Sequence, residues 1–381
     1  MPRIENLPPV PPKPGRKKVP SPRRLLFVFR INMLLCGLAL GVYFACTIRP
    51  ETFWLAGFSG FIVPPLLLVH LSFLVYWLYR KPFYGIFSGF ILFLGIRFLA
   101  ATIGWHIFQT EPCSTFKVLS FNAKAFGGMV PNKVRKDDEN AILIRQVTKS
   151  DAQILCIQEF YDNPKSKTYN VIDRLKANGF HYIYFSKAKT YRWGGSVGMA
   201  ICSRYQILSK QTIRKKTGSN NQIIRAKIDV DGQNLVLINM HLQSIFIKEQ
   251  DIDAENIKEN FIASISRIFL KMKVAFQART KQIDLLLAST LDEDLPVIIC
   301  GDMNDTPYSN AYVRLRDSFQ NGFEEKGLGF GITFKGKIPF LRIDHQFAND
   351  KLKITRFKTR RDFSGSDHYA TEACYSFGRP N

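Results

Sequence analysis

No two of the seven cysteines are spaced as C-x-x-C, and none lies in a Cys/His cluster with the spacing of a zinc site. The sequence therefore excludes a structural zinc of that kind. Five cysteines fall in apolar or strand-like runs, where we expect buried, reduced thiols: Cys36, Cys46, Cys156, Cys202 and Cys300. Cys113 and Cys374 are the two that look exposed enough to pair, and the sequence leaves their pairing open.

Acidic residues are also scarce. The 381 residues include 31 Asp and Glu against 53 Lys and Arg, which gives a net charge of +22. Of these, 3 acidic and 12 basic residues precede Cys113, so the rest of the chain carries a charge of +13. A surplus of this size favours an anionic partner, whether a polynucleotide, an anionic lipid or a phosphorylated small molecule, without distinguishing among them.

Long apolar runs, by contrast, fill the first part of the chain. Residues 25–48, 53–79 and 84–108 are each long enough for the ~20 residues that a bilayer crossing requires. Arg30 and Arg97 interrupt the first and third runs, but one Arg can reach the interface or face a neighbouring helix. A cleaved signal peptide does not fit a run that starts late and is followed by two more. We therefore predict three transmembrane helices.

Basic residues are unevenly distributed around these runs. Residues 1–24 hold eight prolines and seven basic residues against one acidic residue, and we expect a disordered basic tail there. Arg80 and Lys81 follow the second run, whereas Arg49 is the one basic residue between the first two. The positive-inside rule places the tail and the second loop in the cytoplasm. With three spans, everything after about residue 110 then lies outside.

The remaining 270 or so residues show short strand-like runs with helical patterns between them. Strands are predicted at residues 116–122, 154–158, 182–185, 197–202, 222–229, 235–240, 297–300, 342–348 and 370–375. Helices are predicted at residues 139–148 and 171–177, with a long one at about 255–291 that contains a break. Many strands interleaved with helices in this order indicate two packed sheets covered by helices.

One strand stands out because of the polar turn at its end. Residues 297–307 read V-I-I-C-G-D-M-N-D-T-P, a run apolar on both faces that ends in a glycine and a turn. Asp302 and Asn304 lie two residues apart at its carboxyl end, so their side chains emerge on one face. A buried strand that presents a carboxylate and an amide on a turn is a typical place for a functional site. The alternative is that both residues only cap the loop.

Polar residues end several other apolar strands. They are Asn122, Glu159, His241 and Asp344, and Asp367 and His368 just before the last strand. Carboxylates suit a hard divalent cation, amides and imidazoles bind phosphate oxygens, and a carboxylate beside a histidine fixes an imidazole for acid–base work or charge stabilisation. This set indicates phosphate-ester hydrolysis. Ordinary alternatives remain for some members: a satisfied core histidine for His241, a surface carboxylate for Glu159 and a turn cap for Asp344.

The segments S-F-N, Q-E, N-M-H-L, G-D-M-N-D-T-P, R-I-D-H and S-D-H occur in this order across about residues 115–378. In order and spacing they resemble the endonuclease/exonuclease/phosphatase superfamily. This DNase I-like group also includes AP endonucleases, inositol-polyphosphate 5-phosphatases, neutral sphingomyelinases and deadenylases. The resemblance implies an α/β fold, a four-layered α/β sandwich, here preceded by the three predicted transmembrane helices. It also implies an Mg²⁺- or Mn²⁺-dependent phosphodiesterase or phosphomonoesterase.

The resemblance further implies roles for individual residues. The metal ligands would be Glu159, Asn122 and Asp367. Asp302 would activate or orient the attacking water, steadied by Asn122, and Asn304 and His241 would bind the phosphate. His368, oriented by Asp344, would contact the scissile phosphate and stabilise its developing charge.

Two positions depart from one branch of that family. AP endonucleases carry a metal-site Asp and a phosphate-binding Tyr where this chain has Lys124 and His241. These departures weaken the case for an abasic-site repair activity. A membrane-tethered catalytic domain resembles the layout of some neutral sphingomyelinases. Residues 191–198 and the insert at about 245–274 flank the expected cleft. They are either specificity elements or simply a hairpin turn and a helical cover.

The sequence thus predicts a basic tail at residues 1–24, a membrane region at 25–110 and a catalytic domain at 111–381. The resemblance to membrane-anchored bacterial members implies a multi-pass protein of the bacterial inner membrane with a periplasmic catalytic domain. The partner would be a phosphoester, either nucleic acid, which the basic charge favours slightly, or a phospholipid headgroup. A catalytically silent module that binds an anionic ligand is the alternative from another class.

Overall fold

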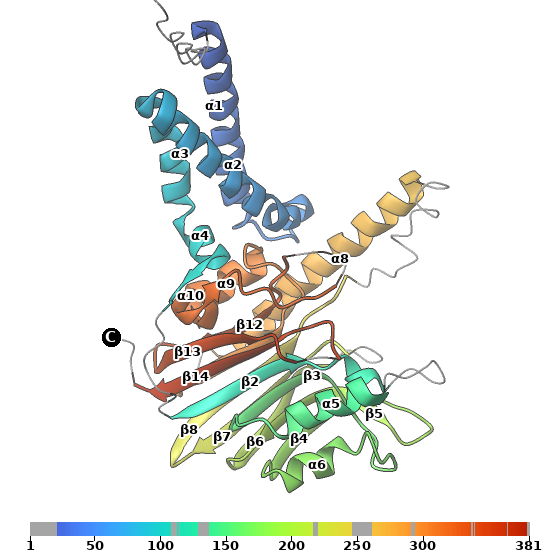
Figure 1. Ribbon diagram of the computed structural model, residues 1–381. Coiled ribbons are helices and arrows are strands. Elements are labelled where there is room, and N and C mark those ends of the chain that lie inside the picture. The colour runs from blue at the N-terminus through green and yellow to red at the C-terminus, as the bar shows by residue number, and fades with distance from the viewer. Residues whose placement is uncertain are drawn as a thin grey trace, which may run out of the picture.

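The computed structural model describes residues 21–107, 113, 115–128, 137–215, 220–245, 261–290, 294–336, 338, 340–363 and 365–378. The predicted basic tail lies outside these residues except at its end, where the first helix already begins at Pro22. A helical bundle stands on one end of a two-sheet domain (Figure 1).

The bundle consists of the helices α1 (Pro22–Ala45), η1 (Trp54–Phe58), α2 (Ser59–Arg80), α3 (Pro82–Leu94) and α4 (Ile96–Thr102). Two of the described helices are long and apolar enough to cross a membrane, the first being α1 and the second α2 together with η1. The pair α3 and α4 makes a third candidate, bent by 67° at the break between them. The expected count of three spans is therefore the upper of the two counts that length and composition allow.

A small polar cluster joins the three long helices of the bundle. Ser88 Oγ donates to Asn32 Oδ1 at 2.9 Å, and His70 Nδ1 lies 3.3 Å from Ser88 Oγ. The other ring nitrogen of His70 lies 3.3 Å from the carbonyl of Leu35. All three side chains are buried. Hydrogen bonds between apolar helices hold the helices in register, because a lipid environment offers their polar groups no other partner.

The globular part is built on two six-stranded sheets. The first has the order β13 (Leu352–Arg360), β14 (Ala370–Phe377), β2 (Phe116–Asn122), β3 (Ile154–Asp162), β5 (Ser196–Ser203), β4 (Tyr182–Thr190). The second has the order β10 (Gln320–Asn321), β12 (Asp344–Ala348), β9 (Val297–Asp302), β8 (Gln233–His241), β7 (Gln222–Val230), β6 (Ile207–Lys215). The short strands β1 (Gly104–Trp105) and β11 (Leu328–Gly329) pair with each other.

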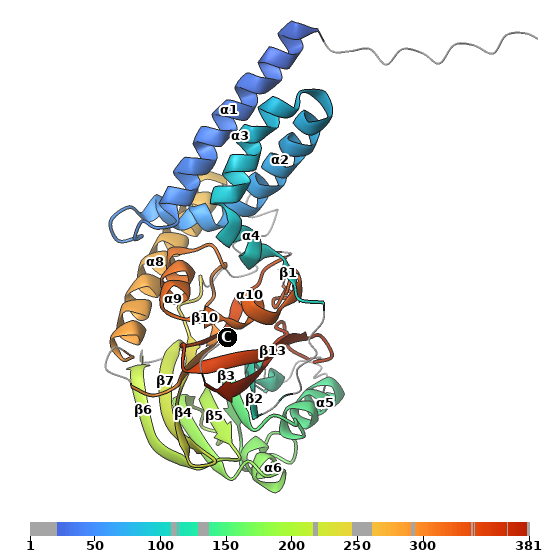
Figure 2. The same ribbon diagram turned by 90° about the vertical axis from the view of Figure 1, so that its left-hand side faces the viewer.

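The two sheets pack face to face through one apolar cluster, and helices cover both outer faces (Figures 1 and 2). The first sheet is covered by α5 (Asp137–Thr148) and α6 (Val171–Ala177), whose apolar side chains join those of β2 and β3. The second is covered by α8 (Phe261–Ala288) and α9 (Asn310–Ser318). The remaining helices are η2 (Lys124–Gly127) and α10 (Gly322–Lys326). The expected α/β sandwich of four layers is confirmed.

Besides the two-residue strands β1, β10 and β11, two long strands of the structure have no counterpart among the predicted ones. They are β6, with the sequence ILSKQTIRK, and β13, with the sequence LKITRFKTR. Each lies at the edge of its sheet. Lysine and arginine are common on edge strands because they discourage pairing with another chain, and they dilute the apolar pattern that identifies buried strands.

The break predicted within residues 255–291 is wrong for the described residues. Phe261–Ala288 is one continuous helix, α8. This stretch contains no glycine or proline, the residues that most often kink a helix, so its hydrogen-bond ladder runs uninterrupted. Residues 255–260 lie outside the described residues. The other segment beside the expected cleft is residues 191–198, of which 191–195 form the turn between β4 and β5 and 196–198 begin β5.

The loop between α1 and α2 lies against the globular domain. Arg49 Nη2 pairs with Asp284 Oδ2 of α8 at 2.5 Å, and Asn310 Nδ2 of α9 donates to the carbonyl of Thr47 at 3.0 Å. At the far end of the same bundle lie the start of α1 and the turn between α2 and α3 (Figure 2). This loop and the globular domain are therefore on the same side of the helices.

Cys113 and Cys374 form a disulfide that ties the segment before β2 to β14. The other five cysteines are free and buried, as expected. Because the bond closes a loop of 261 residues in the unfolded chain, we expect reduction to lower the free energy of unfolding by roughly 2–5 kcal/mol. Thermal unfolding with and without reductant measures this effect, and the double variant Cys113→Ser/Cys374→Ser should not respond to reductant. Finding seven titratable thiols instead of five in the unreduced, denatured protein would contradict the pairing.

Candidate functional site

Three strands of the second sheet bring polar residues into line at one end. Strand β8 runs parallel to β9 with His241 opposite Asp302, and β9 runs antiparallel to β12 with Asp302 opposite Asp344. His241, Asp302 and Asp344 are therefore neighbours across the sheet, and all three are buried. The sequence placed each of them at a strand end, but only the register sets them side by side.

The first sheet contributes the facing residues. Strand β2 ends at Asn122, β3 passes through Glu159, and His368 precedes β14. Ser366 Oγ donates to the carbonyl of Asn122 at 2.7 Å and accepts from the His368 backbone N–H at 3.1 Å. These two bonds hold the loop before β14 against the end of β2, so Asn122 and His368 face the same site.

Asp302 lies at the centre of this arrangement. Asn122 Nδ2 donates to Asp302 Oδ2 at 3.0 Å across the two sheets, and the Asn304 backbone N–H donates to Asp302 Oδ1 at 2.7 Å. The same Oδ2 lies 3.6 Å from His241 Nε2 and 3.8 Å from His368 Nε2. Asp302 is 1 % exposed. One buried carboxylate oxygen thus faces both imidazoles without a short contact to either.

His368 is held by Asp344, as the resemblance implies. The imidazole Nδ1 lies 2.9 Å from Asp344 Oδ2, and the Asp344 backbone N–H donates to Thr333 Oγ1 at 3.1 Å. Burial opposes the charged imidazole, but the carboxylates of Asp344 and Asp302 outweigh burial and raise the pKa of His368 to about 10. His368 is therefore a cation at neutral pH, suited to stabilising negative charge on a phosphoryl group.

Glu159 occupies an unusual backbone position. Its φ is +47°, and the pairing of β3 with β5 is irregular between Ile157 and Phe160. A non-glycine residue at positive φ inside a strand is strained, and such strain gathers at functional sites. The bulge turns the side chain toward the site, where Glu159 Oε1 lies 3.9 Å from His241 Nε2. The carboxylate is 24 % exposed, so it is not the surface carboxylate of the ordinary alternative.

Asp367 pairs with Lys124, the residue that stands where AP endonucleases have a metal-site Asp. Its Oδ2 lies 2.8 Å from Lys124 Nζ, and both side chains are partly exposed. Lys124 begins η2, where Lys124, Ala125 and Phe126 all have positive φ. Lys124 therefore places a positive charge beside the Asp367 carboxylate.

Asn304 is placed differently from the other site residues. Its φ is +52°, and its side chain donates to the carbonyl of Leu242 at 3.0 Å. Its backbone carbonyl accepts from Arg279 Nη1 at 2.7 Å. The described contacts of Asn304 therefore hold the turn after β9, and its one contact with the site residues is the backbone N–H on Asp302.

The donor atoms suit a hard divalent cation. Glu159, Asp367 and Asn122 offer carboxylate and amide oxygens, the ligands that Mg²⁺ and Mn²⁺ prefer. Within the described residues, Glu159 accepts no hydrogen bond, so its oxygens are available. The tightest group of possible ligand atoms in the described residues is a different one, Asp302, Asp344 and His368, all within 4.8 Å of one another. Because His368 is protonated and bonded to Asp344, this group is better explained as a charge-compensated imidazolium.

Some residues that build the site were missed by the sequence analysis. Arg279 is a fully buried residue of α8 whose Nε lies 2.9 Å from Asp305 Oδ2, and it holds the turn after β9. Thr333 positions Asp344, and Phe334 packs edge-on against His368 with the ring centroids 5.1 Å apart. The sequence could have indicated a buried Arg279, because this residue lies between Phe276 and Ile283 on the apolar face of α8. Thr333 and Phe334 lie in a loop with no distinguishing pattern.

Comparison with known proteins gives two family matches. The endonuclease/exonuclease/phosphatase family matches residues 119–368, about two thirds of the chain. A domain of unknown function, DUF8431, matches residues 23–102, the helical bundle. No curated protein matches the sequence.

Several solved structures are similar to the chain. An endonuclease/exonuclease/phosphatase from Beutenbergia cavernae has 16 % identity over 69 % of this chain and 72 % of that one, with a TM-score of 0.49. A family protein from Leptotrichia buccalis has 17 % identity, coverage of 69 % and 100 %, and a TM-score of 0.49. The human Nocturnin catalytic domain with bound sulfate has 15 % identity, coverage of 74 % and 98 %, and a TM-score of 0.49. Similarity of this degree says nothing about the substrate.

Proposed function

Because this chain belongs to the endonuclease/exonuclease/phosphatase family, we propose that it hydrolyses phosphoric diesters with the cluster around Asp302. The observation that supports this proposal most directly is the position of Asp302. It is buried, fixed by Asn122 from the facing sheet, and its Oδ2 faces His241 and His368 at 3.6 and 3.8 Å. A carboxylate held in this way can accept a proton from water while the two imidazoles bind the phosphoryl oxygens.

The proposed reaction is a displacement at phosphorus. Asp302 orients a water molecule and takes its proton as the water oxygen bonds to phosphorus. The bond from phosphorus to the leaving alkoxide breaks, and the alkoxide keeps the bonding electrons and takes up a proton. The products are a phosphomonoester and an alcohol. Imidazolium His368, fixed by Asp344, stabilises the added charge on the phosphoryl oxygens, and His241 binds them from the other side.

We propose Glu159, Asn122 and Asp367 as the ligands of Mg²⁺ or Mn²⁺. The bound cation would supply Lewis-acid stabilisation of the phosphoryl group and help position the nucleophile. Asp367 is paired with Lys124, so a cation at this place shares the Asp367 carboxylate with Lys124 or displaces it. Asn122 keeps a free lone pair, because its Oδ1 accepts one hydrogen bond, from the Lys124 backbone N–H at 3.0 Å.

We also propose that residues 25–110 anchor the protein in a bacterial inner membrane by several spans, with residues 111–381 as the catalytic domain on the periplasmic side. Three observations support this topology. Basic residues gather at the end of the bundle away from the domain. The loop that contains Arg49 contacts the globular domain. The Cys113–Cys374 disulfide suits an oxidising compartment.

Among phosphodiesters, the positive charge of the chain slightly favours nucleic acid, with a phospholipid headgroup as the alternative substrate. A catalytically silent binding module is a weaker candidate, because it would have no use for the His368–Asp344 pair or the strained Glu159.

The test is turnover of p-nitrophenyl ethyl phosphate, a small soluble diester, by the full-length protein in lipid nanodiscs. We expect release of p-nitrophenol with Mg²⁺ or Mn²⁺ and none after chelation with EDTA. A control for specificity is Asp350→Asn, which alters an exposed aspartate in the turn after β12 and should behave as wild type. A folded, metal-binding protein that cleaves neither this diester nor plasmid DNA would refute the proposed activity.

A further inference from the structure

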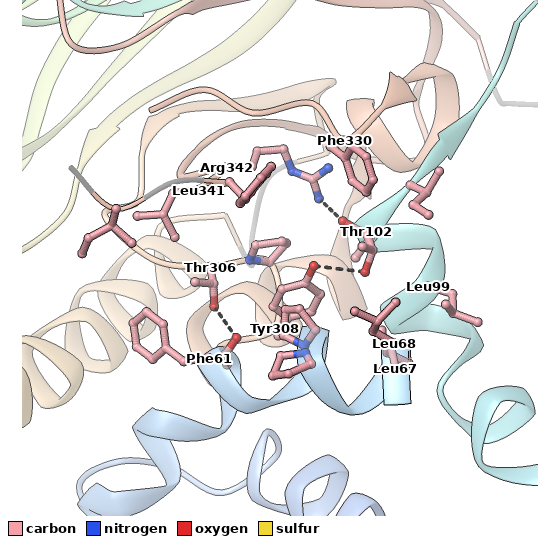
Figure 3. A pocket seen from close by; sticks show the side chains of 18 of the residues that line it. Phe61, Leu67, Leu68, Leu99, Thr102, Thr306, Tyr308, Phe330, Leu341 and Arg342 are labelled. Carbon is pink, nitrogen blue, oxygen red and sulfur yellow. Dashed lines mark hydrogen bonds between the residues drawn. The ribbon is translucent and has the colours of Figure 1, made fainter. Parts of the chain in front are cut away.

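A cavity of about 580 Å³ lies between the helical bundle and the globular domain (Figure 3). Helix α2 forms one wall with residues that include Phe61, Leu67 and Leu68, and α4 forms another with Leu99 and Thr102. The domain closes the cavity with residues 306–308 after β9 and, before β12, with Phe330, Ile338 and residues 340–342. No part of the activity proposed above uses this cavity.

The lining of the cavity is mostly apolar, and several of its polar side chains form hydrogen bonds between the helices and the domain. Thr102 Oγ1 lies 3.0 Å from the Tyr308 hydroxyl, Thr306 Oγ1 donates to the Gly60 carbonyl at 3.4 Å, and Arg342 Nη2 donates to the Ala101 carbonyl at 2.5 Å (Figure 3). These bonds tie the membrane helices to the domain loops. Arg342 Nε and Nη1 are buried without a hydrogen-bond partner among the described residues. Most of the other lining residues are apolar, so the cavity offers its contents mainly hydrocarbon surface.

Glycine allows this close approach of helix to domain. A Cβ atom at position 60 would lie 2.5 Å from Thr306 Oγ1, too close for any other residue without movement. Helix α2 can therefore lie directly against the turn that follows the candidate active site, and the cavity is a built feature of this junction.

The rim of the cavity carries exposed apolar side chains on both sides. Leu68 and Leu71 of α2 are 66 % and 49 % exposed, and Phe330, Ile338 and Phe340 of the domain loop are 56 %, 53 % and 76 % exposed. A patch of this kind in water is unfavourable, but α2 is one of the helices long and apolar enough to cross a membrane. The rim is therefore suited to the surface of a bilayer, where the neighbouring molecules are lipids.

The two domain segments of the cavity lead directly into the candidate active site. Asp302 and Asp344 are paired residues of β9 and β12, and beyond them the Met303 backbone N–H donates to the Ile343 carbonyl at 2.9 Å. Thr306 follows Asp302 by four residues, a reach of at most about 14 Å. Phe334, which packs on His368, also precedes β12 and follows the lining residue Phe330 by four positions. One molecule with a polar end and an apolar tail is therefore able to occupy both places.

We propose that the cavity takes a hydrocarbon chain of a membrane lipid whose phosphoester lies at Asp302 and His368. This proposal rests on the hydrolase activity proposed above and names its substrate class as amphiphilic phosphodiesters drawn from the bilayer. The bond that forms and the bond that breaks are those of the displacement already described, so the tail contributes binding and takes no part in the chemistry.

The experiment compares two substrates that differ only in their alkyl group, p-nitrophenyl hexadecyl phosphate and p-nitrophenyl ethyl phosphate. Both release p-nitrophenol, and the full-length protein is assayed in lipid nanodiscs. We expect kcat/KM to be at least about tenfold higher for the hexadecyl ester, because each methylene buried in the cavity contributes roughly a factor of four.

Partition of the long ester into the bilayer would also raise its rate, so variants must separate the two causes. In Leu71→Trp, where the indole occupies the cavity, we expect the ratio of the two kcat/KM values to fall at least about tenfold. Leu78→Trp is the matched control, since Leu78 is a similarly exposed leucine two turns along the same face of α2 and outside the cavity. Its ratio should stay at the wild-type value.

A second variant keeps the proposal testable if Leu71→Trp misfolds. Phe340→Asp places a charge at the rim, and Phe340 is 76 % exposed with a φ of +63°, which aspartate tolerates. It should lower the same ratio.

Ratios that stay at wild-type values in both variants would overturn the lipid proposal. If the protein cleaves the two esters equally well and prefers plasmid DNA to the hexadecyl ester, the lipid proposal is overturned in favour of a nuclease. Failure to cleave either ester or plasmid DNA would refute the proposed activity itself, so the two failures are distinguishable.

Discussion

Replacement of Asp302 by asparagine is expected to lower kcat for the soluble diester by roughly a thousandfold or more, the range for loss of a general base. Asparagine keeps the shape of the side chain and still accepts a hydrogen bond from Asn122, but it cannot take a proton from water. It also removes one of the carboxylates that keep His368 charged. Steady-state kinetics on p-nitrophenyl ethyl phosphate measure the effect.

The control is Asp350→Asn, which makes the same chemical change at an exposed turn and should leave kcat within experimental error. Asp302 and His368 should act as a unit, because their side chains face one another at 3.8 Å. His368→Ala combined with Asp302→Asn is therefore expected to cost little more than the more severe single change. A value of kcat within tenfold of wild type for Asp302→Asn would rule out this residue as the base.

Glu159→Gln is expected to raise the concentration of Mg²⁺ or Mn²⁺ required for half-maximal activity by roughly 10–100-fold or more. The side chain keeps its size, but it loses the one site carboxylate that is partly exposed and accepts no hydrogen bond among the described residues. A hard cation gains most from charged oxygen ligands, so a neutral amide binds it weakly.

Two measurements separate a lost ligand from a damaged fold. Direct Mn²⁺ binding, followed by electron paramagnetic resonance, should weaken in parallel with activity, and excess metal should restore part of the turnover. Glu325→Gln, an exposed glutamate of α10, is the matched control and should bind Mn²⁺ as wild type does. Unchanged Mn²⁺ affinity in Glu159→Gln would place the metal elsewhere, with the cluster of Asp302, Asp344 and His368 as the next candidate.

Strands buried on both faces were the elements that the sequence located best. Phe116–Asn122 was predicted at its observed bounds, because a largely apolar, strand-like run ended by a polar residue has few other interpretations. Most of the site residues came from the same signal, since they end such runs, whereas Asp367 and His368 lie just before the last strand. The edge strands β6 and β13 were not predicted, because their charged residues interrupt the apolar pattern of a strand.

Two features could be predicted from the amino-acid sequence alone: apolar helices before an α/β domain of this family, and polar residues at several strand ends. Those features depend on local pattern and residue type. Three features of the site became known from the folded structure: Asn122 reaches across the sheets to Asp302, Glu159 lies at a strained bulge, and Lys124 pairs with Asp367. The cavity beside the membrane helices also belongs to the tertiary structure. Register, bulges and the docking of distant segments arise from packing between residues far apart in the chain, which no local pattern records.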